Sequence, residues 1–142
     1  QTVIEEAKQY LDGKGISYEV SGVSSVSDVQ SAITTLAGKV DGIFIPIDNT
    51  VASAMSTVAA ICTKAGVPVY VSADSMVKDG GLATVGVNYT QLGTQTADMA
   101  MKVLTGTAPK DLPVETMKDY AVTVNPDTAA ALGVDVSAYT AK

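Results

Sequence analysis

The stretch Gly42-Ile43-Phe44-Ile45-Pro46-Ile47 is apolar at nearly every position and shows no alternation with polar residues. Such a run is typical of a β-strand that is covered on both faces. Pro46 lacks the N–H that a β-ladder needs, so we expect it at the end of the strand. Asp48, Asn49 and Thr50 follow directly and can cap a helix. The stretch therefore predicts a buried strand that leads through polar residues into a helix.

Helical and extended patterns alternate along the rest of the chain. Apolar residues at helical spacing predict helices over residues 2–12, 27–37, 51–65, 90–104 and 126–133. Extended patterns predict strands over residues 17–23, 42–47, 68–72, 83–89 and 120–124. This order favours an α/β fold with an open, mostly parallel sheet and helices on both faces.

The beginning of the chain departs from this pattern. A chain of this class normally starts with a strand, which often lies in the middle of the sheet. Here the helix at residues 2–12 comes first. We therefore expect the sequence to be a segment of a longer polypeptide, whose sheet lacks a central strand when the segment is taken alone.

Composition excludes several classes of function. The chain has 142 residues, of which 46% are hydrophobic and 17% charged, a balance that fits a folded domain. Its net charge is −6 and all nine cations are lysines, so no nucleic-acid footprint is expected. There is no His and a single Cys, which removes the usual zinc ligands and the commonest general base. We expect no metal and no cofactor.

Two polar segments are candidates for a ligand site. Ligands of open α/β sheets bind beyond the carboxyl ends of the strands. The segment Asp48-Asn49-Thr50 follows one expected strand, and the segment Ala73-Asp74-Ser75 follows the next. We expect both at one edge of the sheet. Free N–H groups at the helix start beside Asn49 and Thr50 would hold a carboxylate, and an Asp would receive an ammonium group. The pair would suit a zwitterion or a small polar ligand with several hydroxyls.

Other interpretations of these residues stay open at this point. Asn49 could serve only as a helix cap, and Asp74-Ser75 could be a plain turn. A receiver-like regulatory domain phosphorylated on Asp48 is the main alternative function. An α/β enzyme without His or Arg would depend on carboxylates alone. Cys62 has no base beside it in the pattern and is expected to be a buried small hydrophobic residue.

Residues 39–55, which contain the Asp48-Asn49-Thr50 segment, resemble ABC-transporter solute-binding proteins of the family that includes the tryptophan-binding type. The resemblance continues in order along the chain, at residues 72–77, 80–86, 92–96, 103–106, 113–115, 125 and 131–133.

The resemblance implies one lobe of a two-lobed, type I periplasmic-binding-protein fold, without the other lobe and without the first strand of this one. Residues 1–86 would form most of the C-terminal lobe, 87–117 would cross and pack on the missing N-terminal lobe, and 118–142 would return. Gly86, Val87 and Asn88 would act as the hinge. The implied protein is not an enzyme.

The same resemblance implies a function and its partners. A solute of the amino-acid class, with aromatic amino acids among the candidates, would be captured between the lobes by closure. An ABC permease in the membrane would receive it. The expected location is periplasmic or extracellular, with a lipoprotein anchor as one form of attachment.

Overall fold

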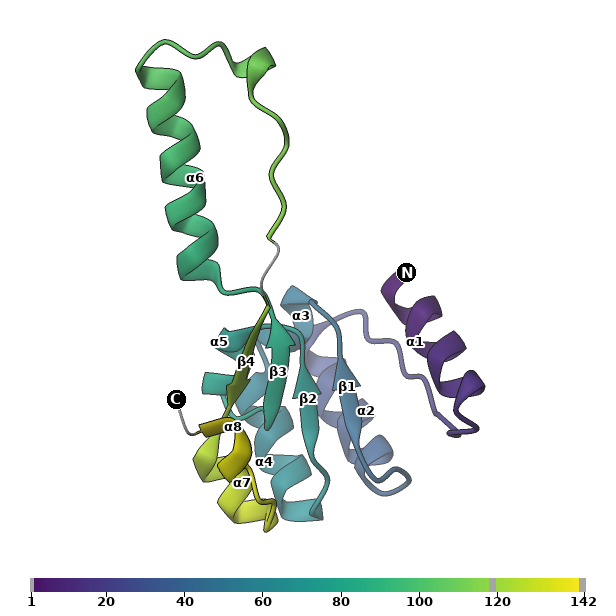
Figure 1. The fold of residues 1–142 in the computed structure, drawn as a ribbon. Coiled ribbons are helices and arrows are strands. Elements are labelled where there is room, and N and C mark those ends of the chain that lie inside the picture. Colours follow the sequence, from purple (N-terminus) through teal and green to yellow (C-terminus); the bar gives the residue numbers. More distant parts are fainter. Residues whose placement is uncertain (1, 118–119, 141–142) are drawn as a thin grey trace.

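The computed structural model describes residues 2–117 and 120–140. Its centre is a four-stranded sheet with the strand order β1-β2-β3-β4 (Figure 1). The strands β1 (Ile43–Ile45), β2 (Val69–Val71) and β3 (Ala83–Gly86) run parallel. The last strand, β4 (Ala121–Val124), pairs antiparallel with β3. The expected open, mostly parallel sheet is confirmed.

Helices occupy most of the remaining chain. They are α1 (Thr2–Gly13), α2 (Val26–Ala37), α3 (Asn49–Ala52), α4 (Met55–Ala65), α5 (Asp74–Lys78), α6 (Tyr89–Leu104), η1 (Pro109–Asp111), α7 (Pro126–Leu132) and α8 (Ser137–Thr140). Side chains of α2, α4 and α5 share one buried cluster with the strands, among them Val29, Ile33, Val58, Cys62 and Met76. This cluster is the core that holds the sheet in place.

Along β1 and β2, one face of the sheet is buried and the other is exposed. Ile43 and Ile45 are buried, whereas Phe44 between them is 50% exposed. Val69 and Val71 are buried in the same way, and Tyr70 is 47% exposed. Successive strand residues point to opposite faces, so the second face is largely bare beside these two strands. The expectation that helices cover both faces of the strand at 42–47 is wrong for this structure.

The strand expected at residues 17–23 does not form, although the structure describes all of these residues. They run as irregular chain between α1 and α2. A strand exists only when its backbone groups pair with a neighbour. The pattern of residues 17–23 favours an extended backbone, but it does not show whether a neighbouring strand is present to pair with them.

Shorter features also differ from the expectations. The helix expected at 51–65 is divided into α3 and α4, with Ser53 and Ala54 between them. Helix α2 begins one residue earlier than expected, with Ser25 as its N-cap and Asp28 as the reciprocal partner. The helices α5 and α8 were not expected, because four or five residues are too few to show a helical period.

Helix α6 stands away from the α/β body, and the chain returns beside it through residues 105–117 (Figure 1). None of its residues, all of which are described, is buried. The apolar side chains of this helix, such as Leu92, Met99 and Val103, therefore enter no core within the described residues. The division of the chain at residues 86 and 117 stays a prediction, and residues 118 and 119, where the third part begins, lie outside the described residues.

Burial of Cys62 leads to a test of the core. The side chain is 1% exposed, and desolvation raises the pKa of its thiol to about 11. The thiolate is the reactive form, so we expect alkylation by iodoacetamide at about pH 8 to be at least roughly a hundredfold slower in the folded chain than in urea. Mass spectrometry of quenched samples measures both rates. Equal rates would contradict the burial of Cys62 in the core.

Candidate ligand-binding site

The two polar segments lie at the same edge of the sheet. Strands β1 and β2 are parallel neighbours, with Ile43 opposite Val69 and Ile45 opposite Val71. Their carboxyl ends are therefore level, and the residues that follow them start from adjacent points. The expected common edge for Asp48-Asn49-Thr50 and Ala73-Asp74-Ser75 is confirmed.

Asp48 has a structural task in the first segment. It is the N-cap of α3, and its Oδ1 atom accepts a hydrogen bond from the N–H of Val51 at 3.0 Å. The capping role that the sequence left open for Asn49 thus belongs to Asp48, and Asn49 is the first residue of the helix. Asp48 and Asn49 are exposed and Thr50 is half-buried. A carboxylate has about four lone-pair sites, so the cap leaves Asp48 able to accept further hydrogen bonds.

Asp74 opens a helix in the second segment, so the alternative of a plain turn is wrong. It is the first residue of α5, and its Oδ1 accepts a hydrogen bond from the N–H of Ser75 at 2.9 Å. Its Oδ2 lies 3.8 Å from Nζ of Lys78, whose side chain is 75% exposed. An exposed pair of this kind contributes little and separates readily. Ala73 is buried, Asp74 is half-buried and Ser75 is exposed, so this segment faces solvent only in part.

Ser72 links the two strand ends and was not among the expected site residues. Its hydroxyl donates a hydrogen bond to the carbonyl oxygen of Ile45 at 3.0 Å. The bond ties the last residue of β1 to the residue after β2, just before each polar segment begins. The sequence does show a serine at the end of an apolar strand. Its hydrogen-bond partner lies 27 residues away, so local sequence patterns could not identify it.

The three expected hinge residues lie where the chain leaves the body. Gly86 is the last residue of β3, Val87 forms an isolated parallel bridge with Ala73, and Asn88 is the N-cap of α6. The bridge joins the expected hinge directly to the second polar segment. The chain re-enters the sheet beside the same point, because Ala121 of β4 pairs with Gly86. The sequence predicted a return of the chain over residues 118–142 but not that it would pair beside Gly86.

The site offers hydrogen-bonding groups and negative charge. Among the described residues, no group of three or more His, Cys, Asp or Glu side chains is placed to hold a metal ion. Within the same described part of the chain, no helix is long and apolar enough to span a membrane.

An open α/β domain with polar segments at the carboxyl edge of its strands has the arrangement in which such folds bind ligands. Comparison with known families gives the particular group. The chain belongs to the ABC transporter substrate binding protein family, whose model matches residues 1–141. Membership agrees with the prediction that the chain is not an enzyme, and it favours the binding-protein prediction over the receiver alternative.

Curated relatives and solved structures support this assignment. A tyrosine-binding protein of Clostridioides difficile is 36% identical over 117 residues, which are 81% of this chain and 34% of that protein. An ABC domain from Streptococcus pneumoniae in complex with L-Trp has a TM-score of 0.81 and 37% identity, over 95% of this chain and 46% of that one. A conserved domain protein from Vibrio cholerae has a TM-score of 0.84 and 34% identity, over 99% and 49%. The chain spans half or less of the length of these proteins.

The close packing at Gly86 leads to a stability test. A Cβ atom at this position would lie 2.8 Å from the carbonyl oxygen of Ser72 and 2.8 Å from Oγ1 of Thr84. Backbone cannot move aside cheaply, so we expect Gly86→Ala to lower the free energy of unfolding by about 1–3 kcal/mol. Denaturant unfolding followed by circular dichroism measures the change.

Gly93→Ala is the matched control, because a Cβ there meets nothing within 4 Å and Gly93 lies inside α6. It should leave stability unchanged or raise it by up to about 1 kcal/mol. If Gly86→Ala unfolded at the same denaturant concentration as the unchanged chain, the tight junction between β3 and Ser72 would be disproved.

Proposed function

We propose that this chain is one lobe of the solute-binding component of an ABC import system, and that its ligand is an amino acid, most simply an aromatic one. The main support is the placement of two polar segments at one edge of adjacent parallel strands, in a chain that belongs to this family. The relatives named for tyrosine binding and solved with L-Trp favour an aromatic amino acid as the ligand.

The chemistry of the edge suits the head group of an amino acid. An ammonium group carries three donors, and the carboxylates of Asp48 and Asp74 are acceptors. The amide of Asn49 and the hydroxyls of Thr50 and Ser75 provide donors for the carboxylate of the ligand. The Asp48 carboxylate is already oriented by its bond to Val51, so little side-chain freedom remains to be lost on binding.

Closure of two lobes on the ligand is the proposed mechanism. In the open form the polar segments are exposed to water, and a second lobe would cover them. Water exclusion strengthens each charged hydrogen bond. A ligand that contacts both lobes favours the closed form by its difference in affinity for the two forms. Gly86, Val87 and Asn88 form one proposed hinge, and the return of the chain near Ala121 forms a second beside it.

The partners are the amino-acid ligand, the second lobe of the same polypeptide and a membrane permease. The protein would work outside the cytoplasm, in the periplasm or at the cell surface, where a lipid anchor would keep it near the permease. The family description supports a role in ABC transport.

Calorimetry on the polypeptide that contains both lobes, titrated with L-tryptophan and L-tyrosine, tests the proposal. Asp48→Ser keeps a side-chain cap for α3 but removes the charge. We expect it to weaken binding roughly ten- to a hundredfold, the cost of losing a hydrogen bond to a charged group. Asn49→Ala should weaken binding by a smaller factor, because the amide is neutral.

Asp41→Ser is the matched control, because Asp41 is exposed and precedes β1 at the opposite edge of the sheet. It should bind as the unchanged protein does. Unchanged affinity in both Asp48→Ser and Asn49→Ala would place the ligand elsewhere, and the absence of heat with every amino acid would reject the class of ligand.

A further inference from the structure

Asn125 lies at the point where the returning chain leaves the sheet. It follows β4 directly and is the N-cap of α7. Its backbone N–H donates to the carbonyl oxygen of Leu82 at 2.9 Å. Its Oδ1 accepts hydrogen bonds from the N–H groups of Asp127 and Thr128 at 3.1 and 3.0 Å. These bonds fix the position of the Asn125 side chain at the start of the helix.

The amide nitrogen of Asn125 makes a bond that helix capping does not require. Nδ2 donates to the carbonyl oxygen of Val77 at 2.8 Å, although the two residues are 48 positions apart. Serine and aspartate also cap helices, but serine is shorter and an ionised aspartate has no donor. If the oxygen and nitrogen of the amide were exchanged, each would face a group of its own kind, so the three bonds define its orientation. Asparagine therefore joins α7 to a distant segment as well as capping it.

Val77 lies in the last turn of α5, the helix that begins with Asp74. A helix of five residues is too short to be stable alone. Burial of Val77 holds α5 against the core, but the hydrophobic effect has no direction and does not set the angle of the helix. The bond from Asn125 fixes one end of α5, and the parallel bridge between Ala73 and Val87 fixes the residue before the other end. Two fixed ends define the direction of the helix.

The turn that follows α5 strengthens this link. The hydroxyl of Thr128 donates to the carbonyl oxygen of Gly80 at 3.1 Å. The N–H of Gly80 in turn donates to the carbonyl oxygen of Val77 at 3.1 Å. Gly80 has a φ of +111°, and a Cβ atom there would collide with the Cβ of Ala59 in α4. The carboxyl end of α5 is therefore enclosed between α4 and α7.

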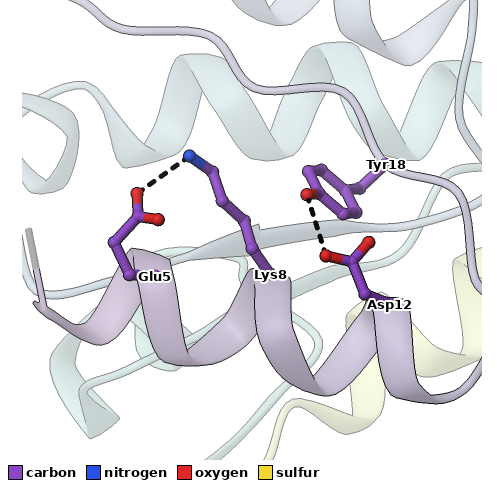
Figure 2. A network of polar contacts seen from close by, with 4 residues as sticks. All are labelled: Glu5, Lys8, Asp12 and Tyr18. Atoms are coloured by element: carbon purple, nitrogen blue, oxygen red, sulfur yellow. Dashed lines mark hydrogen bonds and ion pairs between the residues drawn. The ribbon is translucent and has the colours of Figure 1, made fainter.

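Partial burial separates the Asn125 bond from the surface contacts of the chain. Around α1, Lys8 donates to Glu5 at 2.9 Å and Tyr18 donates to Asp12 at 3.5 Å, and both contacts are exposed (Figure 2). Water competes for such exposed groups, so each contributes little. The part-buried bond of Asn125 is less open to this competition. We therefore expect its loss to have a measurable effect on α5.

The side chain of Asp74 takes its position from α5. Its Oδ1 accepts from the N–H of Ser75 at 2.9 Å, and its Oδ2 lies 3.8 Å from Nζ of Lys78. Both partners belong to α5, so the carboxylate moves with the helix. A group that binds a ligand must be held within about 0.5 Å of its productive position. Whatever holds α5 at its angle therefore also places the Asp74 carboxylate.

We infer that Asn125 is a positioning residue of the ligand site: through the carbonyl of Val77 it holds α5 at the angle that presents Asp74 to the ligand. The part that concerns the ligand rests on the proposed function, whereas the hold on α5 rests on the hydrogen bonds alone. Asn125 enters the domain only after the chain has passed through α6 and β4. The returning chain thus contributes to a site whose two polar segments follow β1 and β2.

Hydrogen exchange without ligand, in the polypeptide that contains both lobes, tests the hold on α5. Asn125→Ser keeps a side-chain oxygen that caps α7 but is too short to reach Val77. We expect the amides of Val77 and Asp79, which are hydrogen-bonded within the α5 segment, to exchange about tenfold faster or more. Ala130→Gly is the matched control, because it weakens α7 at an exposed position and keeps the bond from Asn125. It should leave the exchange of both amides unchanged.

Calorimetry on the same polypeptide with L-tryptophan and L-tyrosine tests the consequence for the ligand. Asn125→Ser should weaken binding roughly three- to tenfold, the effect of losing one neutral hydrogen bond. In a protein that already carries Asp74→Ala, the same substitution should weaken binding less than about twofold, because Asn125 acts through Asp74. In a protein that carries Asp48→Ser, it should keep its full effect. A merely structural role would give the same loss in every background.

Two results would overturn the inference. One is unchanged exchange of the Val77 and Asp79 amides in Asn125→Ser. The other is an equal loss of affinity from Asn125→Ser with and without Asp74→Ala. Absence of binding by the unsubstituted protein would instead reject the proposed function and the part of Asp74 in it, while the exchange measurement would still decide whether Asn125 holds α5.

Discussion

The parallel pairing of β1 with β2 is the constraint on which the rest of the site depends. Its register makes the two strand ends level, and the hydrogen bond from Ser72 to the carbonyl oxygen of Ile45 ties them together. The isolated bridge between Ala73 and Val87 extends the connection to the residues that lead into α6. One ladder therefore positions both polar segments and the point where the chain leaves the domain. A site built on such a ladder is better fixed than one built on free loops.

The polar side chains at this edge serve the fold as well as the proposed ligand. Asp48 caps the start of α3, and Asn88 caps the start of α6. A cap of this kind is worth about 1 kcal/mol, so loss of a side chain weakens the helix as well as the site. For this reason the test uses Asp48→Ser, because serine still caps α3 but carries no charge.

Much of the fold could be predicted from the sequence, because the α/β alternation is carried by local periodicity. The run from Gly42 to Ile47 predicted a strand with Pro46 at its end, and the observed β1 ends one residue before Pro46, at Ile45. The sequence also placed the two polar segments at one edge correctly. It could not show that residues 17–23 lack a partner, since pairing depends on a neighbouring strand. It missed Ser72, whose hydrogen bond joins residues distant in the chain, and the break between α3 and α4, which tertiary packing decides.

The most direct test of the account is a crystal structure of the two-lobed polypeptide with L-tryptophan or L-tyrosine bound. We predict that the head group lies within hydrogen-bond distance of a side chain from each polar segment, with Asp48 or Asn49 on one side and Asp74 or Ser75 on the other. A ligand bound at another surface of the sheet, with both segments still open to water, would contradict the account.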